Sequence, residues 1–257
     1  KPLLVYGPAI EYGHIGAGSP VADVWFETTK YGLTGSGKPY SPDNCITSEQ
    51  MGVISARQAL ASSQNVAASR LYEQIIDKRP LEFLEKMGYS KITPNHYNYL
   101  SSALGPITAT VEENVGAFAT FANNGDFIEP YLIERIEDSE GNIVFQHEVE
   151  PVEVFSPQTA YIISDMLRDV LTNRRGTAQI MKQNLNFNID LAAKTGTSDD
   201  FGDAWLVGYN PNVTLGVCIG YKYRTWRLQE GTKKYDTPSA RDNPLYTNFI
   251  KGNNARR

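Results

Sequence analysis

Cysteine and histidine are scarce in this chain, which has two cysteines and three histidines among 257 residues. Their spacing fits no metal-ligand pattern and the histidines are scattered, so we expect no metal centre. Two isolated cysteines do not make a disulfide framework, although a bond between Cys45 and Cys218 stays open. We expect Cys218 to be a small core residue within a strand and Cys45 to lie in a loop.

Long apolar runs are also absent. No stretch of about 18 apolar residues occurs, so we expect no transmembrane helix within the chain. A signal-peptide pattern and an initiator methionine are missing as well, and we expect the chain to be a fragment of a longer protein. Because Pro2 fits the first turn of a helix, we expect the helix over residues 3–12 to begin before Lys1.

Positive charge is not in excess. The chain carries 24 Lys and Arg against 29 Asp and Glu, which gives a formal net charge of −5. This balance, without a basic stripe, argues against a nucleic-acid partner, because a phosphate backbone would be repelled. Hydrophobic residues at 41% and charged residues at 21% predict a folded globular protein that buries a full core.

The hydrophobic pattern predicts mostly helices first and strands later. Helical spacing and cap signals predict helices over residues 3–12, 48–62, 66–78, 81–87, 111–124 and 157–172. Alternation predicts a hairpin of residues 131–137 and 142–148, and strands over 189–193, 204–209 and 214–222. Residues 13–48 are rich in Gly, Pro, Ser and Thr, and we expect them to be irregular, with at most short strands around 24–28.

Strands joined by short turns pair antiparallel. The predicted fold class is therefore α/β of the α+β type, an antiparallel β-sheet flanked by helices. A helical lobe is expected over residues 41–125, inserted between the two parts that form the sheet and its flanking helices, 1–40 and 126–257.

The most informative pattern is Lys-Thr-Gly-Thr at 194–197. On a sheet edge, a cation, two hydroxyls and free backbone N–H groups would lie along one line. Such a line can bind a peptide carboxylate and polarise a carbonyl, as acyl transfer on a peptide requires. Alone the pattern is weak, because a strand end with a turn glycine uses the same residues.

Two further polar features are ambiguous on their own. Ser63-Gln64-Asn65 interrupts two helical patterns and is typical of a helix-capping loop, although such a loop can also present Ser63 and Asn65 to a cleft. Lys1 would face a residue three positions earlier on its helix, but taken alone it is an ordinary N-terminal lysine.

Together these patterns resemble the transpeptidase domain of class A penicillin-binding proteins, which are serine penicillin-recognising acyltransferases with S-x-x-K, S-x-N and K-T-G motifs. Lys1 matches the end of the first motif, Ser63 and Asn65 match the second, and residues 194–197 match the third. The resemblance covers most of residues 1–222 and includes segments 40–44, 57–63, 119–125, 175–178 and 203–209. The family's nucleophilic serine would lie three residues before Lys1, outside this sequence.

The resemblance implies a role for each motif residue. Lys1 would be the base that activates the serine, with its pKa lowered by burial and by the neighbouring cation Lys194. Ser63 would relay a proton toward the leaving amine, and the backbone N–H of Thr197 would help to form the oxyanion hole. The implied catalytic residues are Lys1, Ser63 and Lys194, and the implied substrate-binding residues are Asn65, Thr195, Gly196 and Thr197.

The resemblance also implies the reaction and its surroundings. The activity would be D,D-transpeptidation, which cross-links peptidoglycan stem peptides ending in D-Ala-D-Ala through a serine acyl-enzyme, without a metal or an organic cofactor. β-Lactam antibiotics would acylate the same serine. The full protein would carry a glycosyltransferase domain and a membrane anchor N-terminal to this chain, and would lie on the extracytoplasmic face of a bacterial membrane.

Other functions remain open from the sequence. The same fold supports a hydrolase, either a D,D-carboxypeptidase or a β-lactamase, which would need an activated water for deacylation. A β-lactam-binding sensor domain and a structural remnant without a site are further alternatives. The acceptor amine and the role of residues 223–257 are not indicated by any pattern.

Overall fold

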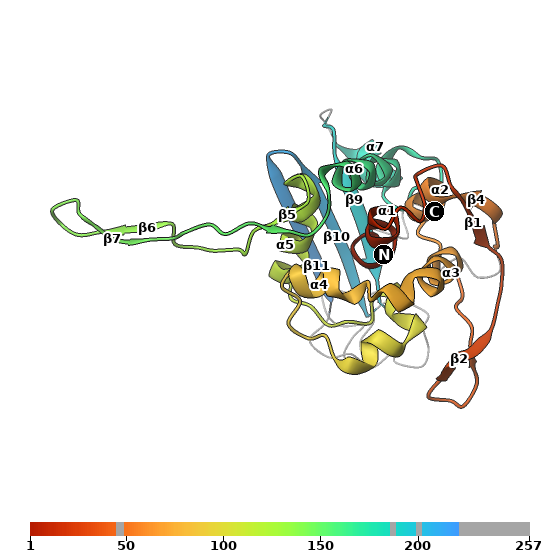
Figure 1. Ribbon diagram of the computed structural model, residues 1–257. Helices are drawn as coiled ribbons and strands as arrows, with labels where there is room; N and C mark the ends of the chain where they lie inside the picture. Colours follow the sequence, from red (N-terminus) through yellow and green to blue (C-terminus); the bar gives the residue numbers. More distant parts are fainter. Residues whose placement is uncertain (45–48, 186–188, 199–201, 221–257) are drawn as a thin grey trace, which may run out of the picture.

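The computed structural model describes residues 1–44, 49–185, 189–198 and 202–220. The chain begins with a π-helical turn, η1 (Pro2–Tyr6), that continues into α1 (Gly7–Glu11). This confirms the helix expected over residues 3–12. Nearly all of its residues are buried, and Figure 1 shows it at the centre of the molecule between the other helices and the sheet.

The main sheet has the strand order β11-β10-β9 and is antiparallel throughout. Its described strands are β9 (Ala192–Thr197), β10 (Asp203–Asn210) and β11 (Val213–Gly220). The prediction of a strand over 189–193 was wrong in its bounds, because the strand begins at Ala192 and carries the 194–197 motif within it. The other two strands are confirmed as far as residue 220. Among the described strands β9 forms an edge, as the motif requires.

Two long helices pack on one face of this sheet (Figure 1). Helix α6 (Pro157–Thr172) contacts β9, and α5 (Val111–Ala122) contacts β11 and β10. Both begin at caps that the sequence predicts. The Ser156 side chain accepts a hydrogen bond from the backbone of Thr159, and Thr110 forms a reciprocal capping box with Glu113.

A second group of helices follows a small sheet in which β1 (Pro20–Asp23) pairs with β4 (Gly52–Ser55). The group consists of α2 (Ala56–Ala61), α3 (Asn65–Ile75), the 3-10 turn η2 (Ile76–Lys78) and α4 (Leu81–Lys86). The helices expected over 66–78 and 81–87 are confirmed. The division of the chain into a lobe and a sheet part stays a prediction.

The helix expected over residues 48–62 is wrong in its first half. Gly52–Ser55 is a strand because it pairs in register with β1, and Ser55 is extended and caps α2 through a capping box with Gln58. Short strands do occur around residues 24–28, but they end at residue 23 and resume at residue 28. Residues 24–27 lie between β1 and β2 (Thr28–Leu33), which pairs with β3 (Pro39–Tyr40).

The remaining elements are short. They are the 3-10 helices η3 (Pro94–Asn98) and η4 (Leu100–Leu104), the pair β5 (Asp126–Phe127) and β8 (Val152–Glu153), and α7 (Gln179–Asn184). The predicted hairpin is confirmed as β6 (Arg135–Glu137) paired with β7 (Ile143–Gln146). It projects far from the body of the molecule in Figure 1.

The core lies between η1, α1, α3, α5 and α6. Its largest fully buried side chains include Tyr6, Tyr72 and Phe155. The prediction that Cys218 belongs to the core is wrong, since its side chain on β11 is exposed. Cys45 lies outside the described residues. No helix in the described part of the chain is both long and apolar enough to cross a membrane.

Candidate active site

Strand β9 places Lys194 inside the molecule. Its side chain is only 7% exposed, and its residue pairs with Val207 of the central strand. The ammonium nitrogen Nζ donates to Ser63 Oγ at 2.9 Å and to the backbone oxygen of Thr195 at 2.8 Å. Burial lowers the pKa of Lys194 from its usual 10.5 to about 8, because removal from water penalises the charged form.

Ser63 stands in the turn between α2 and α3. Its backbone has φ +56°, in the left-handed region that residues other than glycine seldom occupy. Its N–H bonds to the carbonyl of Leu60 at 3.1 Å, which closes the turn at the end of α2. Strained backbone of this kind often marks a functional position, and here the turn directs the Ser63 hydroxyl to Lys194.

Lys1 approaches the same serine from the start of η1. Its Nζ donates to the carbonyl oxygen of Ser63 at 2.7 Å and to Ser63 Oγ at 3.2 Å. It also forms a short hydrogen bond to Asn65 Oδ1. The Ser63 hydroxyl oxygen therefore lies between two lysine nitrogens that come from distant parts of the chain.

Asn65 is the first residue of α3, and its side chain is held on both sides. Its Nδ2 donates to the carbonyl oxygen of Asp43 at 2.7 Å, while its Oδ1 faces Lys1. Its backbone N–H donates to Asn44 Oδ1 at 2.8 Å. The four residues Lys1, Ser63, Asn65 and Lys194, predicted from three separate motifs, thus meet at one place.

The remaining motif residues continue along β9. Thr195 and Thr197 lie on one face of the strand, and Thr197 is exposed, which suits a binding edge. Gly196 lies opposite Trp205, and a Cβ atom at Gly196 would stand 3.2 Å from the Cβ of that tryptophan. The neighbour on β10 therefore leaves little space for a side chain at Gly196, in addition to the room that the glycine leaves along the strand.

Sequence reasoning assigned no role to three residues around this site. Thr177 Oγ1 lies 2.6 Å from Thr195 Oγ1, which adds a third hydroxyl beside the motif. Asn44 and the fully buried Asp23 hold the start of α3. Asn44 and Thr177 lie in the segments 40–44 and 175–178 that carry the family resemblance, and this was the only signal that the sequence offered for them.

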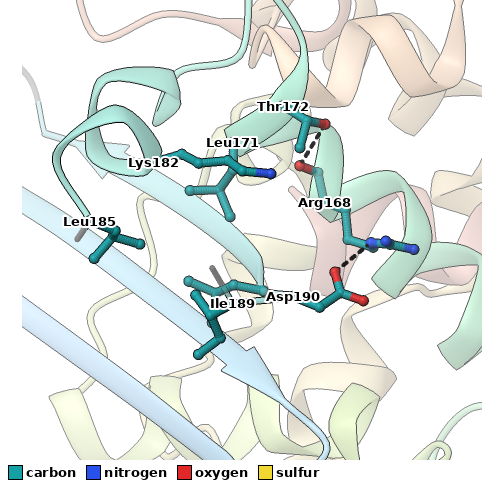
Figure 2. A pocket seen from close by; sticks show the side chains of 8 residues that line it. Arg168, Leu171, Thr172, Lys182, Leu185, Ile189 and Asp190 are labelled. Carbon is teal, nitrogen blue, oxygen red and sulfur yellow. Dashed lines mark hydrogen bonds and ion pairs between the residues drawn. The ribbon is translucent and has the colours of Figure 1, made fainter. Parts of the chain in front are cut away.

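A small pocket lies elsewhere, where the end of α6, α7 and the residues before β9 meet (Figure 2). Arg168 donates from Nε to Asp190 Oδ1 across it at 2.8 Å. None of the expected site residues lines this pocket, so it gives no reason to move the site. In the ranges that the structure describes, no three His, Cys, Asp or Glu side chains are grouped to hold a metal ion.

Comparisons with known proteins identify the family of the chain. The family described as penicillin binding protein transpeptidase domain matches residues 27–241. Penicillin-binding protein 1A of Clostridium perfringens strain 13 is 33% identical over 242 residues, which cover 90% of this chain and 34% of that protein. Penicillin-binding protein 1A of Aquifex aeolicus is 32% identical over 215 residues, or 84% of this chain and 28% of that protein.

Solved structures show the same fold. The crystal structure of penicillin-binding protein 1A from Haemophilus influenzae superposes with a TM-score of 0.75 at 24% identity, and the match covers 90% of this chain and 38% of that one. The D,D-transpeptidase domain of a peptidoglycan glycosyltransferase from Eggerthella lenta gives a TM-score of 0.67 at 20% identity, with 85% and 58% covered.

The chain spans about a third of the length of the curated relatives named above. The matches cover 84–90% of this chain, the fold is shared, and residues of three predicted motifs meet at one hydroxyl. The resemblance that the sequence motifs indicate is therefore confirmed, and the chain belongs to the transpeptidase domain family of the penicillin-binding proteins.

Proposed function

We propose that this chain is the catalytic part of a D,D-transpeptidase that cross-links peptidoglycan stem peptides ending in D-Ala-D-Ala. The nucleophile would be a serine three residues before Lys1, and β-lactams would acylate the same serine. The observation that carries the proposal is the position of Ser63 Oγ, 3.2 Å from Lys1 Nζ and 2.9 Å from Lys194 Nζ. This arrangement is suited to passing a proton from Lys1 through the Ser63 hydroxyl.

In the first step, neutral Lys1 Nζ takes the proton of the serine hydroxyl as the serine oxygen attacks the carbonyl carbon of the penultimate D-Ala. The carbonyl oxygen becomes an oxyanion, which the backbone N–H groups of Thr197 and of the serine would stabilise. One such donor is worth about 3–4 kcal/mol of transition-state stabilisation. The proton that Lys1 gained then passes through Ser63 Oγ to the leaving amine, the C–N bond breaks, and D-alanine departs.

In the second step, the amine of a neighbouring stem peptide attacks the serine ester. Its proton returns by the same path, the C–O bond breaks, and a new peptide bond forms with the serine restored. Asn65 would hydrogen-bond the amide groups of the donor peptide, and Thr195 and Thr197 would hold its terminal carboxylate. Lys194, which remains largely cationic below its pKa of about 8, adds a positive charge beside that carboxylate.

Fluorescent penicillin labelling of the longer protein that contains the serine tests the proposal. We expect Lys1→Ala and Lys194→Ala to lose labelling by about 100-fold or more, in the range of general acid–base contributions. Lys86→Ala is the matched control, because Lys86 is an exposed lysine at the end of α4. Equal labelling of wild type and both active-site variants would refute the assigned roles.

The lifetime of the labelled species separates transpeptidation from hydrolysis. A carboxypeptidase or a β-lactamase would release the penicilloyl group by attack of water, whereas a transpeptidase is expected to keep it until an acceptor amine is supplied. The relatives' names include a peptidoglycan glycosyltransferase. A glycosyltransferase domain and a membrane anchor outside this chain, with the catalytic domain on the extracytoplasmic face, are part of the same proposal.

A further inference from the structure

A buried acid–amide pair lies behind the candidate active site. Asp23, at the end of β1, is 0% exposed, and both of its carboxylate oxygens are occupied. Oδ1 accepts from Asn44 Nδ2 at 2.9 Å, and Oδ2 accepts from the same Nδ2 at 3.1 Å and from the backbone N–H of Met51 at 2.8 Å. A carboxylate in this setting is held in a single orientation.

Asn44 connects this carboxylate to helix α3. Its Oδ1 accepts from the backbone N–H groups of Asn65 at 2.8 Å and Val66 at 3.1 Å. The residue at the N-cap position of α3 is Gln64, and its side chain makes no capping hydrogen bond. Asn44, from a distant segment, therefore satisfies N–H groups that the first turn of a helix leaves without partners.

Whether each group donates or accepts hydrogen bonds fixes the orientation of the side-chain amide next to it. An ionised Asp23 can only accept hydrogen bonds, so the NH₂ of Asn44 must face it and the Asn44 oxygen must face α3. In the same way, the Asp43 carbonyl can only accept from Asn65 Nδ2, which turns Asn65 Oδ1 toward Lys1 Nζ. The side-chain amide of Asn65 thus has one orientation. Its Oδ1 is a fixed acceptor for Lys1 Nζ, the proposed base.

We propose that Asp23 and Asn44 are positioning residues that orient the Asn65 amide and, through it, the Lys1 amine. This inference rests on the proposed function for its effect on rate, but its structural part does not. Replacing Asp23 by a neutral amide would let the Asn44 side chain adopt both orientations. In one of them its NH₂ would oppose the N–H groups of α3, and Asn65 would shift.

Exchanging the two side chains gives a sharp test. Asp23→Asn and Asn44→Asp each break the donor–acceptor match, and Asn44→Asp also places two carboxylates together. In the double variant Asp23→Asn/Asn44→Asp, the carboxylate now at position 44 can accept from α3 and from the amide now at position 23. The oxygen of that amide can accept from Met51. Recovery would be partial, because Asn44 Nδ2 also donates to the carbonyl of Glu49 at 3.1 Å, and that bond is lost.

We expect each single variant to slow acylation by β-lactam about tenfold, the effect of about one hydrogen bond at the site, and the double variant to recover most of this loss. We also expect the pH at which acylation is half-maximal to shift in the single variants, because the surroundings of Lys1 change. Gly216→Ala serves as the stability control. Gly216 lies on β11, the far strand of the sheet, and an added Cβ there would clash with Val115 of α5, so the change should lower the melting temperature without shifting that pH.

The chain offers a chemically matched control in the β6–β7 turn, where Asn142 Nδ2 donates to Asp138 Oδ2 at 2.9 Å in an exposed position. The exchange of Asp138 and Asn142, singly or together, should leave acylation unchanged. Single exchanges at Asp23 and Asn44 that alter neither the rate nor its pH dependence would overturn the proposal, and so would changes that only follow the melting temperature.

The side-chain NH₂ signals of Asn65 in NMR spectra, assigned by their loss in Asn65→Ala, provide a readout without catalysis. We expect them to move in both single variants and to return in the double variant. If the wild-type protein is not acylated at all, the proposed function fails, and the NMR result alone decides the positioning role. Unmoved signals in the single variants would refute it.

Discussion

Lys1 and Lys194 share one acceptor. Their Nζ atoms lie 3.2 Å and 2.9 Å from the same oxygen, Ser63 Oγ, although the two lysines come from the first helix and from the sheet. Two ammonium groups so close together repel each other, and Lys194 is also buried. The site therefore favours loss of a proton from one of them, which is what a base beside a serine nucleophile requires.

The lowered pKa of Lys194 makes stability depend on pH. Because its pKa is about 8 in the folded protein and 10.5 as its usual value, the unfolded chain binds more protons between these values. The contribution of Lys194 to the free energy of unfolding is therefore greatest above pH 10.5. It is lost as the pH falls from 10.5 through about 8. Relative to Lys194→Met, the wild-type free energy of unfolding should rise with pH in this window by up to about 1.4 kcal/mol per pH unit.

Denaturant unfolding of both proteins at pH 7, 8, 9 and 10 measures this difference. Taking the difference between wild type and variant cancels the buried tyrosines, which titrate in both. A difference in unfolding free energy that stays constant across the pH series would contradict the lowered pKa that we expect for the buried Lys194.

Gly196→Ala should destabilise the protein at the centre of the motif. The new methyl group would stand 3.2 Å from the Cβ of Trp205, a tight contact that the tryptophan must relieve by moving a few tenths of an ångström. Overpacking of this kind costs about 1–3 kcal/mol. Gly35→Ala is the matched control, because Gly35 is exposed and a Cβ there meets no atom within 4 Å. Thermal unfolding of the two variants compares them, and equal melting temperatures would contradict the predicted clash.

Thr177→Val should weaken recognition of a substrate carboxylate. The change keeps the shape of the side chain but removes the hydroxyl that lies 2.6 Å from Thr195 Oγ1. Without that partner the Thr195 hydroxyl is free to turn, and we expect about a tenfold loss in acylation by a β-lactam acid. The loss should be much smaller for the methyl ester of the same β-lactam, which has no carboxylate to bind.

Thr172→Val is the control for this change, since the Thr172 hydroxyl bonds within its own helix α6, at 3.1 Å to the carbonyl of Arg168. It should leave both rates unchanged. An equal loss for acid and ester in Thr177→Val would mean that Thr177 acts on folding or on the nucleophile rather than on the carboxylate.

Local signals predicted much of the fold. The caps at Thr110 and Ser156 were correct because a cap depends on residues three positions apart, which the sequence shows directly. The predicted helix start at residue 48 failed because Gly52–Ser55 pairs with a strand some 30 residues earlier, and tertiary pairing outweighs local helical spacing. Cys218 was misplaced for a similar reason, since apolar character in a strand does not tell whether another layer covers it.

The site, like the fold, has residues that local sequence signals predict and residues that only the tertiary structure reveals. Lys1, Ser63, Asn65 and Lys194 were identified because each belongs to a short motif, and the structure brings them together. Asp23 escaped notice because nothing within its own neighbourhood reveals that it is buried against an amide 21 residues away. Polar networks of this kind follow from the fold and not from any local pattern.

The most direct test of the account compares two adjacent serines. Ser63 Oγ lies between the two lysines, whereas Ser62 Oγ bonds to the carbonyl of Gln58 at 2.7 Å, within its own helix. The second-order rate constant of acylation by benzylpenicillin is measured for Ser63→Ala and Ser62→Ala in the longer protein. The account predicts a fall of about 100-fold or more for Ser63→Ala and less than about twofold for Ser62→Ala. Equal rate constants for the two variants would contradict it.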